Sequence, residues 1–171
     1  MGPAQTSKPE TDAAAIGVAH TSPFSSTETA VWIGLLETHK RLTRALNAEL
    51  EAEHGLNISA LELLARLASS EDKVLRLTDL ADRAGLSLSR VSRIVDNLED
   101  RGLVERRRCP EDKRARNAGL TRAGAQLLEV AQATHFAAVK QKFFQHLDSA
   151  EMAALAAVFE RMAPDAGASC T

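Results

Sequence analysis

The sequence contains few aromatic residues and no tyrosine: five Phe and one Trp are present in 171 residues. Ala and Leu are abundant instead, which favours closely packed helices over a large β-sandwich. The chain length leaves room for one compact domain with one hydrophobic core. We therefore expect a mainly α-helical fold.

Cysteine is also scarce. The two cysteines, Cys109 and Cys170, cannot form a disulfide framework, and neither belongs to a CxxC pair. No apolar run approaches the roughly 20 residues that span a membrane, and the N-terminus lacks the charged and apolar regions of a signal peptide. These absences predict a reduced, cytoplasmic protein with no membrane partner.

The motifs of common enzyme classes are missing too. The sequence has no Gly-rich phosphate loop, no nucleophile elbow and no convincing carboxylate pair. His39, His54, His135 and His146 show no close metal-binding spacing. We therefore expect a protein that is not an enzyme and has no catalytic residue, cofactor or metal site.

Charge is distributed unevenly along the chain. The whole sequence has a formal net charge of −2, but residues 83–122 carry eleven Lys and Arg against six Asp and Glu, a net charge of +5. The rest of the chain has a net charge of −7. A basic segment in an acidic body is typical of a surface that binds a polyanion.

Capping residues and hydrophobic periodicity give the order of elements. Residues 1–23 and 164–171 are expected to be a disordered arm and a flexible tail. Between them the pattern predicts the order α-α-β-α-α-β-β-α-α, a mainly α fold with a small β-hairpin wing. The predicted helices and their caps are 25–54 (Ser25, Glu28, closed by Gly55), 59–69 (Ser59, Glu62), 79–84 (Thr78), 87–102 (Ser87), 121–146 (Thr121) and a last one from Asp148 (Glu151), and the predicted strands are 74–77, 104–108 and 115–120.

The two short central helices have the pattern of a helix-turn-helix. Such a motif needs a small residue where the helices cross, a Gly in the turn and apolar residues on the inner face of the second helix. The sequence supplies these in order as Leu80, Ala81, Gly85, Leu86, Val91 and Ile94. An ordinary helical hairpin is the alternative interpretation of these residues.

The polar face of the second helix is a candidate for DNA recognition. Arg90 and Arg93 are the first candidates for base readout, because Arg can form a bidentate pair with guanine. The other candidates are small hydroxyl residues, which allow close approach to DNA: Ser87, Ser89 and Ser92 on this helix, and Thr78 at the start of the preceding helix. The alternative is a solvated Arg face with local ion pairs, such as one between Arg93 and Asp96.

The predicted hairpin concentrates positive charges that repel one another. Contact with phosphates or with the minor groove of DNA would relieve this repulsion. The DNA-contacting candidates in it are Arg106, Arg108, Lys113, Arg114 and Arg116. Side chains alternate along a strand, so Arg106 and Arg108 share one face while Arg107 takes the other. At least one of these three arginines is therefore expected to be only solvated.

Three segments together resemble the MarR (multiple antibiotic resistance regulator) family of winged helix-turn-helix proteins. They are residues 89–106, 112–115 and 120–124, within a similarity that covers about residues 30–162. The resemblance implies an ion pair between Asp112 and Arg114 that presents the arginine to the minor groove. It also implies a homodimer, whose interface residues would be Val31, Leu35, Phe136, Phe143, Leu147, Leu155 and Phe159. A core within one chain is the alternative for some of them.

The resemblance further implies a small aromatic or phenolic effector bound between the dimerisation helices and the winged domain. Trp32, His39 and Arg41 are candidate pocket residues, with packing or surface roles as the alternative. The expected organisation is a single domain over 24–163, with the winged helix-turn-helix at 59–121 and dimerisation helices at 25–54 and 121–163.

The expected function is that of a sequence-specific regulator, a repressor on a pseudo-palindromic operator in double-stranded DNA. A winged-helix module that binds protein instead of DNA is the alternative.

Overall fold

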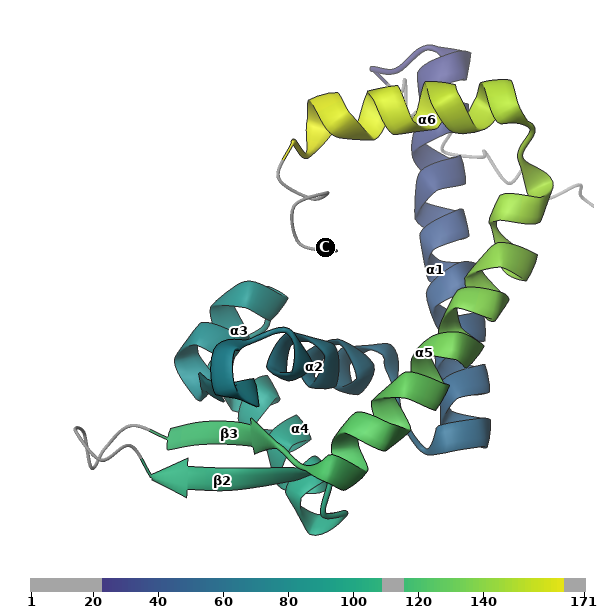
Figure 1. Cartoon of the computed structure of the whole chain (residues 1–171). Helices are drawn as coiled ribbons and strands as arrows, with labels where there is room; N and C mark the ends of the chain where they lie inside the picture. The colour runs from purple at the N-terminus through teal and green to yellow at the C-terminus, as the bar shows by residue number, and fades with distance from the viewer. Residues whose placement is uncertain (1–22, 109–115, 165–171) are drawn as a thin grey trace, which may run out of the picture. The chain divides into compact units, whose positions relative to one another are not determined.

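A computed structural model describes residues 23–108 and 116–164 of the chain, and Figure 1 shows its elements. The predicted order α-α-β-α-α-β-β-α-α is confirmed, with two additional 3-10 turns. The elements are α1 (Ser26–His54), α2 (Ile58–Ala68), η1 (Glu71–Lys73), β1 (Val74–Arg76), α3 (Leu77–Ala84), α4 (Leu88–Asp100), β2 (Val104–Arg108), β3 (Arg116–Leu120), α5 (Arg122–Lys142), η2 (Phe144–His146) and α6 (Ser149–Met162).

The chain divides into two compact units between Leu36 and Glu37. In the first unit, the described residues form the N-terminal part of α1, which begins with the predicted capping box. The Ser25 hydroxyl accepts from the Glu28 backbone N–H at 3.2 Å, and the Glu28 carboxylate accepts from the Ser25 backbone N–H at 2.7 Å. Hydrogen bonds from the Ser25 side chain and backbone lower the pKa of Glu28.

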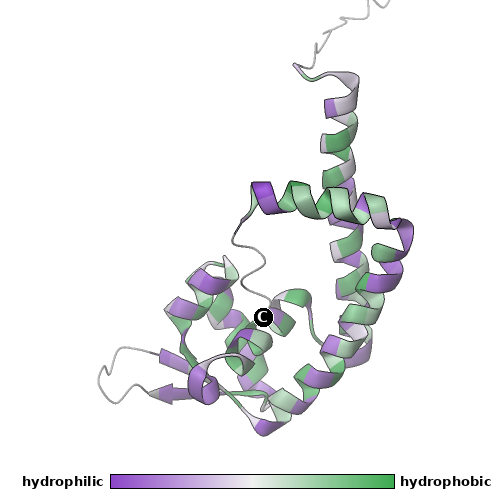
Figure 2. Cartoon of the chain, turned by 45° about the horizontal axis from the view of Figure 1, so that its top comes forward, coloured by the Kyte–Doolittle hydropathy of each residue, from purple (hydrophilic) through white to green (hydrophobic). Residues whose placement is uncertain are grey.

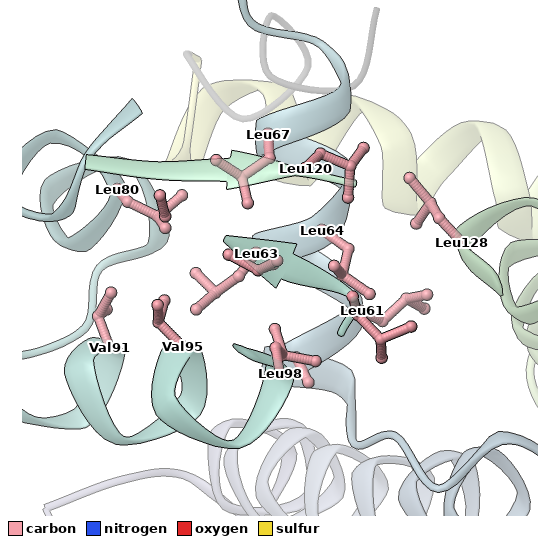
Figure 3. Packing of buried hydrophobic residues seen from close by; sticks show 14 of the residues in the cluster. Leu61, Leu63, Leu64, Leu67, Leu80, Val91, Val95, Leu98, Leu120 and Leu128 are labelled. Atoms are coloured by element: carbon pink, nitrogen blue, oxygen red, sulfur yellow. The ribbon is translucent and has the colours of Figure 1, made fainter. Parts of the chain in front are cut away.

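The core of the second unit surrounds α2. Four leucines of this helix are buried, because their spacing brings them onto faces that other elements cover. Figure 3 shows them between α4, β3 and the start of α5. The core side chains labelled there are Leu61, Leu63, Leu64, Leu67, Leu80, Val91, Val95, Leu98, Leu120 and Leu128, and each is at most 7% exposed.

A small antiparallel sheet lies beside this core, in the order β1-β3-β2. The central strand β3 has strands on both sides, and its Ala118 is fully buried, opposite Leu75 and Arg106. A Cβ on Gly119 would lie 3.2 Å from Arg107 Nε and 3.4 Å from a methyl of Val74. Small residues therefore occupy β3 because neighbours on both strands fill the space above them.

The α5 helix packs closely on the chain that enters β2. A Cβ added to Gly124 would lie 2.1 Å from the Leu103 carbonyl oxygen, so only glycine fits in this first helical turn. The Thr121 hydroxyl caps the helix by accepting from the Gly124 backbone N–H at 3.0 Å, as predicted. The cap and the close approach together fix where α5 leaves the sheet.

Two predicted helix starts are wrong. The α2 helix begins at Ile58, capped by Asn57, whose side chain accepts from the Ala60 backbone N–H at 2.9 Å; the predicted cap was Ser59. Asn47 of α1 accepts from the Ile58 N–H at 2.8 Å, so a second asparagine satisfies the first turn. The α3 helix begins at Leu77 without a side-chain cap, which places Thr78 inside its first turn.

The end of α5 also differs from the prediction. The α-helix ends at Lys142, and Phe143 leaves helical geometry at φ −127°, ψ −65° before the η2 turn. The next prediction is confirmed: Asp148 and Glu151 form a capping box at the start of α6. Apolar residues predominate along α6 in Figure 2.

Candidate nucleic-acid interface

The connection between α3 and α4 is the tight turn of a helix-turn-helix. Gly85 has φ +61°, a left-handed conformation that glycine adopts without steric cost, and Leu86 N–H donates to the Ala81 carbonyl at 3.0 Å. Ala81, the predicted small residue, is 4% exposed. The helix-turn-helix prediction is therefore confirmed, and this turn sets the direction of α4.

The α4 helix has a buried side and an exposed side. Val91, Val95 and Leu98 face the core, as predicted. The exposed N-terminal residues include Ser87, Ser89, Arg90 and Arg93. The structure therefore brings four of the predicted recognition residues together at one solvent-facing helix end. This end carries the positive pole of the helix dipole, which favours an anion.

Local hydrogen bonds order this end of α4. The Ser87 hydroxyl caps the helix by accepting from the Arg90 N–H at 3.3 Å, and it lies 3.2 Å from the Ser89 hydroxyl. The Arg90 guanidinium donates to the Ser59 hydroxyl at 3.2 Å. Arg93 Nε makes a long bond of 3.4 Å to the Ser89 carbonyl. The Arg93 side chain thus lies on the exposed face of α4.

Arg106 binds α4. Its side chain is 20% exposed, its guanidinium pairs with Asp96, and its Nε lies 3.2 Å from a Glu99 carboxylate oxygen. The same guanidinium donates to the Ser92 hydroxyl at 3.2 Å, and the Arg106 N–H donates to Glu99 at 3.1 Å. Asp96 is thus paired with the first wing strand. The predicted DNA contact of Arg106 stays untested, but the described partners of its side chain all lie on the recognition helix.

The structure describes only some of the other wing residues. Arg107 donates to its neighbour Glu105 at 2.8 Å, and Arg116 is exposed opposite Arg108 at the open end of the strand pair. Figure 2 shows hydrophilic residues along this hairpin. Asp112, Lys113, Arg114 and the side chain of Arg108 lie outside the described residues, so the Asp112–Arg114 ion pair stays a prediction.

Sequence reasoning missed a contact between the ends of α4 and α1. The Arg101 guanidinium donates to the Gly55 carbonyl at 2.6 Å and to the His54 carbonyl at 2.9 Å. Gly55 closes α1 with φ +62°, which leaves these last carbonyls without helical partners. A cation at the negative pole of a helix is favourable. Arg101 therefore holds the recognition helix to the C-terminal end of α1.

The residues predicted for a dimer interface lie on α1 and on the segment from α5 to α6. Val31, Leu35, Phe136 and Phe159 are 44% to 67% exposed, while Phe143, Leu147 and Leu155 are half-buried. Each of the two units thus carries large apolar side chains in contact with solvent.

The predicted effector residues are all exposed on α1. Arg41 lines a cavity of about 640 Å³ with Lys142, Phe143, His146 and Leu147, among others. His39 is not one of the lining residues, and Trp32 belongs to the other unit. The structure thus brings one of the three residues to a cavity.

Within residues 23–108 and 116–164, no group of three or more His, Cys, Asp or Glu side chains could hold a metal ion. No helix in the same ranges is long and apolar enough to cross a membrane. Burial lowers the pKa of His135, and its Nδ1 has no hydrogen-bond partner among the described residues.

The helix-turn-helix of α3 and α4, followed by the antiparallel strands β2 and β3, defines a winged helix-turn-helix protein. A sequence profile of the MarR family matches residues 54–115. The chain is similar to Sco3205, a MarR family transcriptional regulator from Streptomyces coelicolor whose crystal structure contains DNA. The two sequences are 32% identical, and the structures match with a TM-score of 0.76. The match covers 83% of this chain and 88% of Sco3205. The chain belongs to the MarR family of transcriptional regulators.

Two further relatives support the assignment to this family. AbsC, a MarR family regulator from Streptomyces coelicolor, is 30% identical with a TM-score of 0.74 over 82% of this chain and 95% of its own. The transcriptional repressor MprA of Escherichia coli is 32% identical over 54% of this chain, and the match spans 52% of MprA. The chain thus spans about half the length of this curated relative. Members of the family are regulators, which confirms the expectation that the protein is not an enzyme.

Proposed function

We propose that this protein binds duplex DNA sequence-specifically, as a homodimer on a pseudo-palindromic operator, and represses transcription. The observation that carries this proposal is the exposed N-terminal end of α4. There Ser87, Ser89 and Arg93 face solvent, while Arg106 pairs with the carboxylates of Asp96 and Glu99 farther along the helix. The recognition helix therefore offers donors at the end that would enter the major groove.

The charge distribution and the similarity to a DNA-bound regulator support DNA as the polyanion that this protein binds. Residues 83–122, a range that includes α4 and the wing, carry a net charge of +5 in a chain of net charge −2 overall. Sco3205, which is 32% identical to this chain over the matched region, was crystallised with DNA. In this proposal Arg90 and Arg93 contact bases, and Thr78 and the wing cations, among them Arg116, contact phosphates or the minor groove.

The dimer would place two α4 helices in successive major grooves, about 34 Å apart. The proposed division of labour has the winged helix-turn-helix at 59–121 and dimerisation helices at 25–54 and 121–163. Large exposed apolar residues on α1 and α6 support this division, because a single chain leaves them in water. Repression is supported by the repressor MprA among the relatives, and a DNA-bound regulator would act in the cytoplasm.

An effector would be a small aromatic or phenolic anion. The cavity beside Arg41 supports this chemistry, since His146 and the apolar Phe143 and Leu147 line it with that arginine, while Lys142, also in the lining, pairs with Glu49 at 2.9 Å. If binding of the effector changed the separation of the two recognition helices, the affinity of the dimer for the two DNA half-sites would fall. Trp32 and His39 are the other candidates on α1.

The test begins with selection of bound duplexes from a random pool, followed by titration of the best duplex at several salt concentrations. We expect affinity to fall steeply with salt, because phosphate contacts release counterions. Arg93→Ala should weaken binding by about 1 to 3 kcal/mol and relax the base preference at one position per half-site. Lys40→Ala, at an exposed cation on α1, is the matched control and should bind as the wild type does.

Two results would contradict the proposal. A pool that yields no preferred duplex would show that α4 does not read sequence. Absence of any shift at low salt would favour a winged-helix module that binds protein.

A further inference from the structure

Leu88 is an exposed apolar residue at the recognition end of α4. It is the first residue of the helix, and 48% of its surface is exposed. Its neighbours Ser87 and Ser89 are polar and exposed. No capping or core role accounts for a leucine here, since the cap is Ser87 and the buried side of the helix begins at Val91.

The position of Leu88 differs from that of the other exposed apolar residues. In the described chain, the remaining large exposed hydrophobic residues all lie before residue 37 or after residue 129, on or next to the helices of the proposed dimer interface. Leu88 is the single one in the described parts of residues 37–129. Contact with a second copy through those helices would therefore leave Leu88 uncovered.

The first turn of α4 holds Leu88 in a defined place. The Ser87 hydroxyl bonds to the Arg90 N–H and lies 3.2 Å from the Ser89 hydroxyl, which fixes the backbone on both sides of the leucine. Ser92, one turn farther along the same side, is bound by Arg106. Leu88 thus lies at the end of a row whose next member already contacts the wing.

The major groove presents one apolar group to a side chain, the C5 methyl of thymine. We propose that Leu88 is a specificity-determining residue that packs on a thymine methyl in each half-site. This inference rests on the proposed function, because it requires the N-terminal end of α4 to enter the major groove. Burial of the leucine against the methyl removes apolar surface of both groups from water. Leu88 would thus select T·A pairs, while Arg93 selects guanine.

The experiment removes the methyl and the leucine separately. Each thymine in one half-site of the selected operator is replaced in turn by deoxyuridine, which lacks only the 5-methyl group. Binding of the wild type, Leu88→Ala and Leu88→Met is then measured on every duplex. Leu88→Met is the matched variant, because it keeps an apolar side chain of similar volume at this position.

We expect one position at which deoxyuridine lowers the affinity of the wild type by about fourfold, which is the effect of losing one buried methyl group. Leu88→Ala should bind the thymine duplex more weakly than the wild type and show no further loss with deoxyuridine there. Leu88→Met, which keeps an apolar group at this position, should still lose affinity with deoxyuridine there. Such a pattern would show that the methyl and the leucine contact each other.

Two results would overturn the inference while the proposed function stands. In one, the wild type binds a preferred operator but no deoxyuridine substitution weakens it, or the half-site contains no thymine. In the other, Leu88→Ala loses as much affinity with deoxyuridine as the wild type does. A wild type without any preferred duplex would overturn the proposed function, and this inference with it.

Discussion

Arginines that look equivalent in the sequence have different environments in the fold. Arg106 is enclosed by Asp96, Glu99 and Ser92, so its charge is balanced by α4. Arg116, on the neighbouring wing strand, is exposed. A cation already paired with two carboxylates adds little attraction for phosphate, whereas a solvated one releases a counterion when it binds DNA. The number of basic residues in the wing therefore overstates its number of phosphate contacts.

Arg106→Gln and Arg116→Ala should separate these two roles. Arg116→Ala should lower the slope of log K against log salt by about one, since one phosphate contact is lost. Arg106→Gln should leave that slope nearly unchanged. It should lower the free energy of unfolding by about 1 kcal/mol or more, because charged hydrogen bonds to α4 are lost. Both quantities are measured by operator titration at several salt concentrations and by urea unfolding.

A different outcome would revise the role of Arg106. If Arg106→Gln lowers the salt slope as much as Arg116→Ala and leaves unfolding unchanged, Arg106 contacts phosphate and does not position the wing.

At the scale of elements, a helix begins where its first N–H groups find partners. A capping pattern at Ser59 and Glu62 is present in the sequence, but α2 begins one residue before Ser59. Asn57 accepts from the Ala60 N–H, and Asn47 of α1 accepts from the Ile58 N–H. With these donors satisfied, the Ser59 hydroxyl is free to accept from Arg90. The start of α2 is therefore fixed partly by another helix.

Asn57→Ala and Ser59→Ala should differ in their effect on stability. Asn57→Ala removes the side-chain cap of α2 and should lower the free energy of unfolding by about 1 kcal/mol. Ser59→Ala removes one exposed hydrogen bond to Arg90 and should change it by about half of that or less. Urea denaturation followed by circular dichroism measures both values. A larger loss for Ser59→Ala would indicate that the serine is the cap.

At the scale of the whole molecule, the proposed dimer depends on apolar surface outside the winged domain. Phe136 on α5 is 63% exposed and Phe159 on α6 is 47% exposed. Apolar side chains that one chain leaves in water can be covered when a second chain binds. A second copy with the same surface would form a symmetric interface and would also supply the second recognition helix.

Phe136→Asp and Phe159→Asp should each convert the dimer into a monomer. A charge buried without a partner in an interface is strongly unfavourable, so the dissociation constant should rise by at least tenfold. Analytical ultracentrifugation over a range of concentrations measures it. Gln126→Asp is the control, because it adds the same charge at an exposed polar position of α5. A wild-type protein that sediments as a monomer, or aspartate variants that stay dimeric, would exclude this interface.

The local signals of the sequence predicted most of the fold. Hydrophobic periodicity gave the order of helices and strands, and the caps at Ser25, Ser87, Thr121 and Asp148 lie where they were expected. These features depend on residues within about one helical turn of each other, which a sequence pattern contains. The helix-turn-helix and its exposed Ser87, Ser89 and Arg93 were predictable for the same reason.

The partners of charged side chains could not be predicted in this way. Arg106 meets Ser92 from 14 positions away, and Arg101 meets Gly55 from 46 positions away. Many acceptors lie at such separations, and only the packing of β2 and α1 against α4 decides which of them an arginine reaches. The sequence by itself determined the elements and the family, because these follow from local patterns. The tertiary structure decided which arginines are bound within the fold and which remain exposed at the recognition surface.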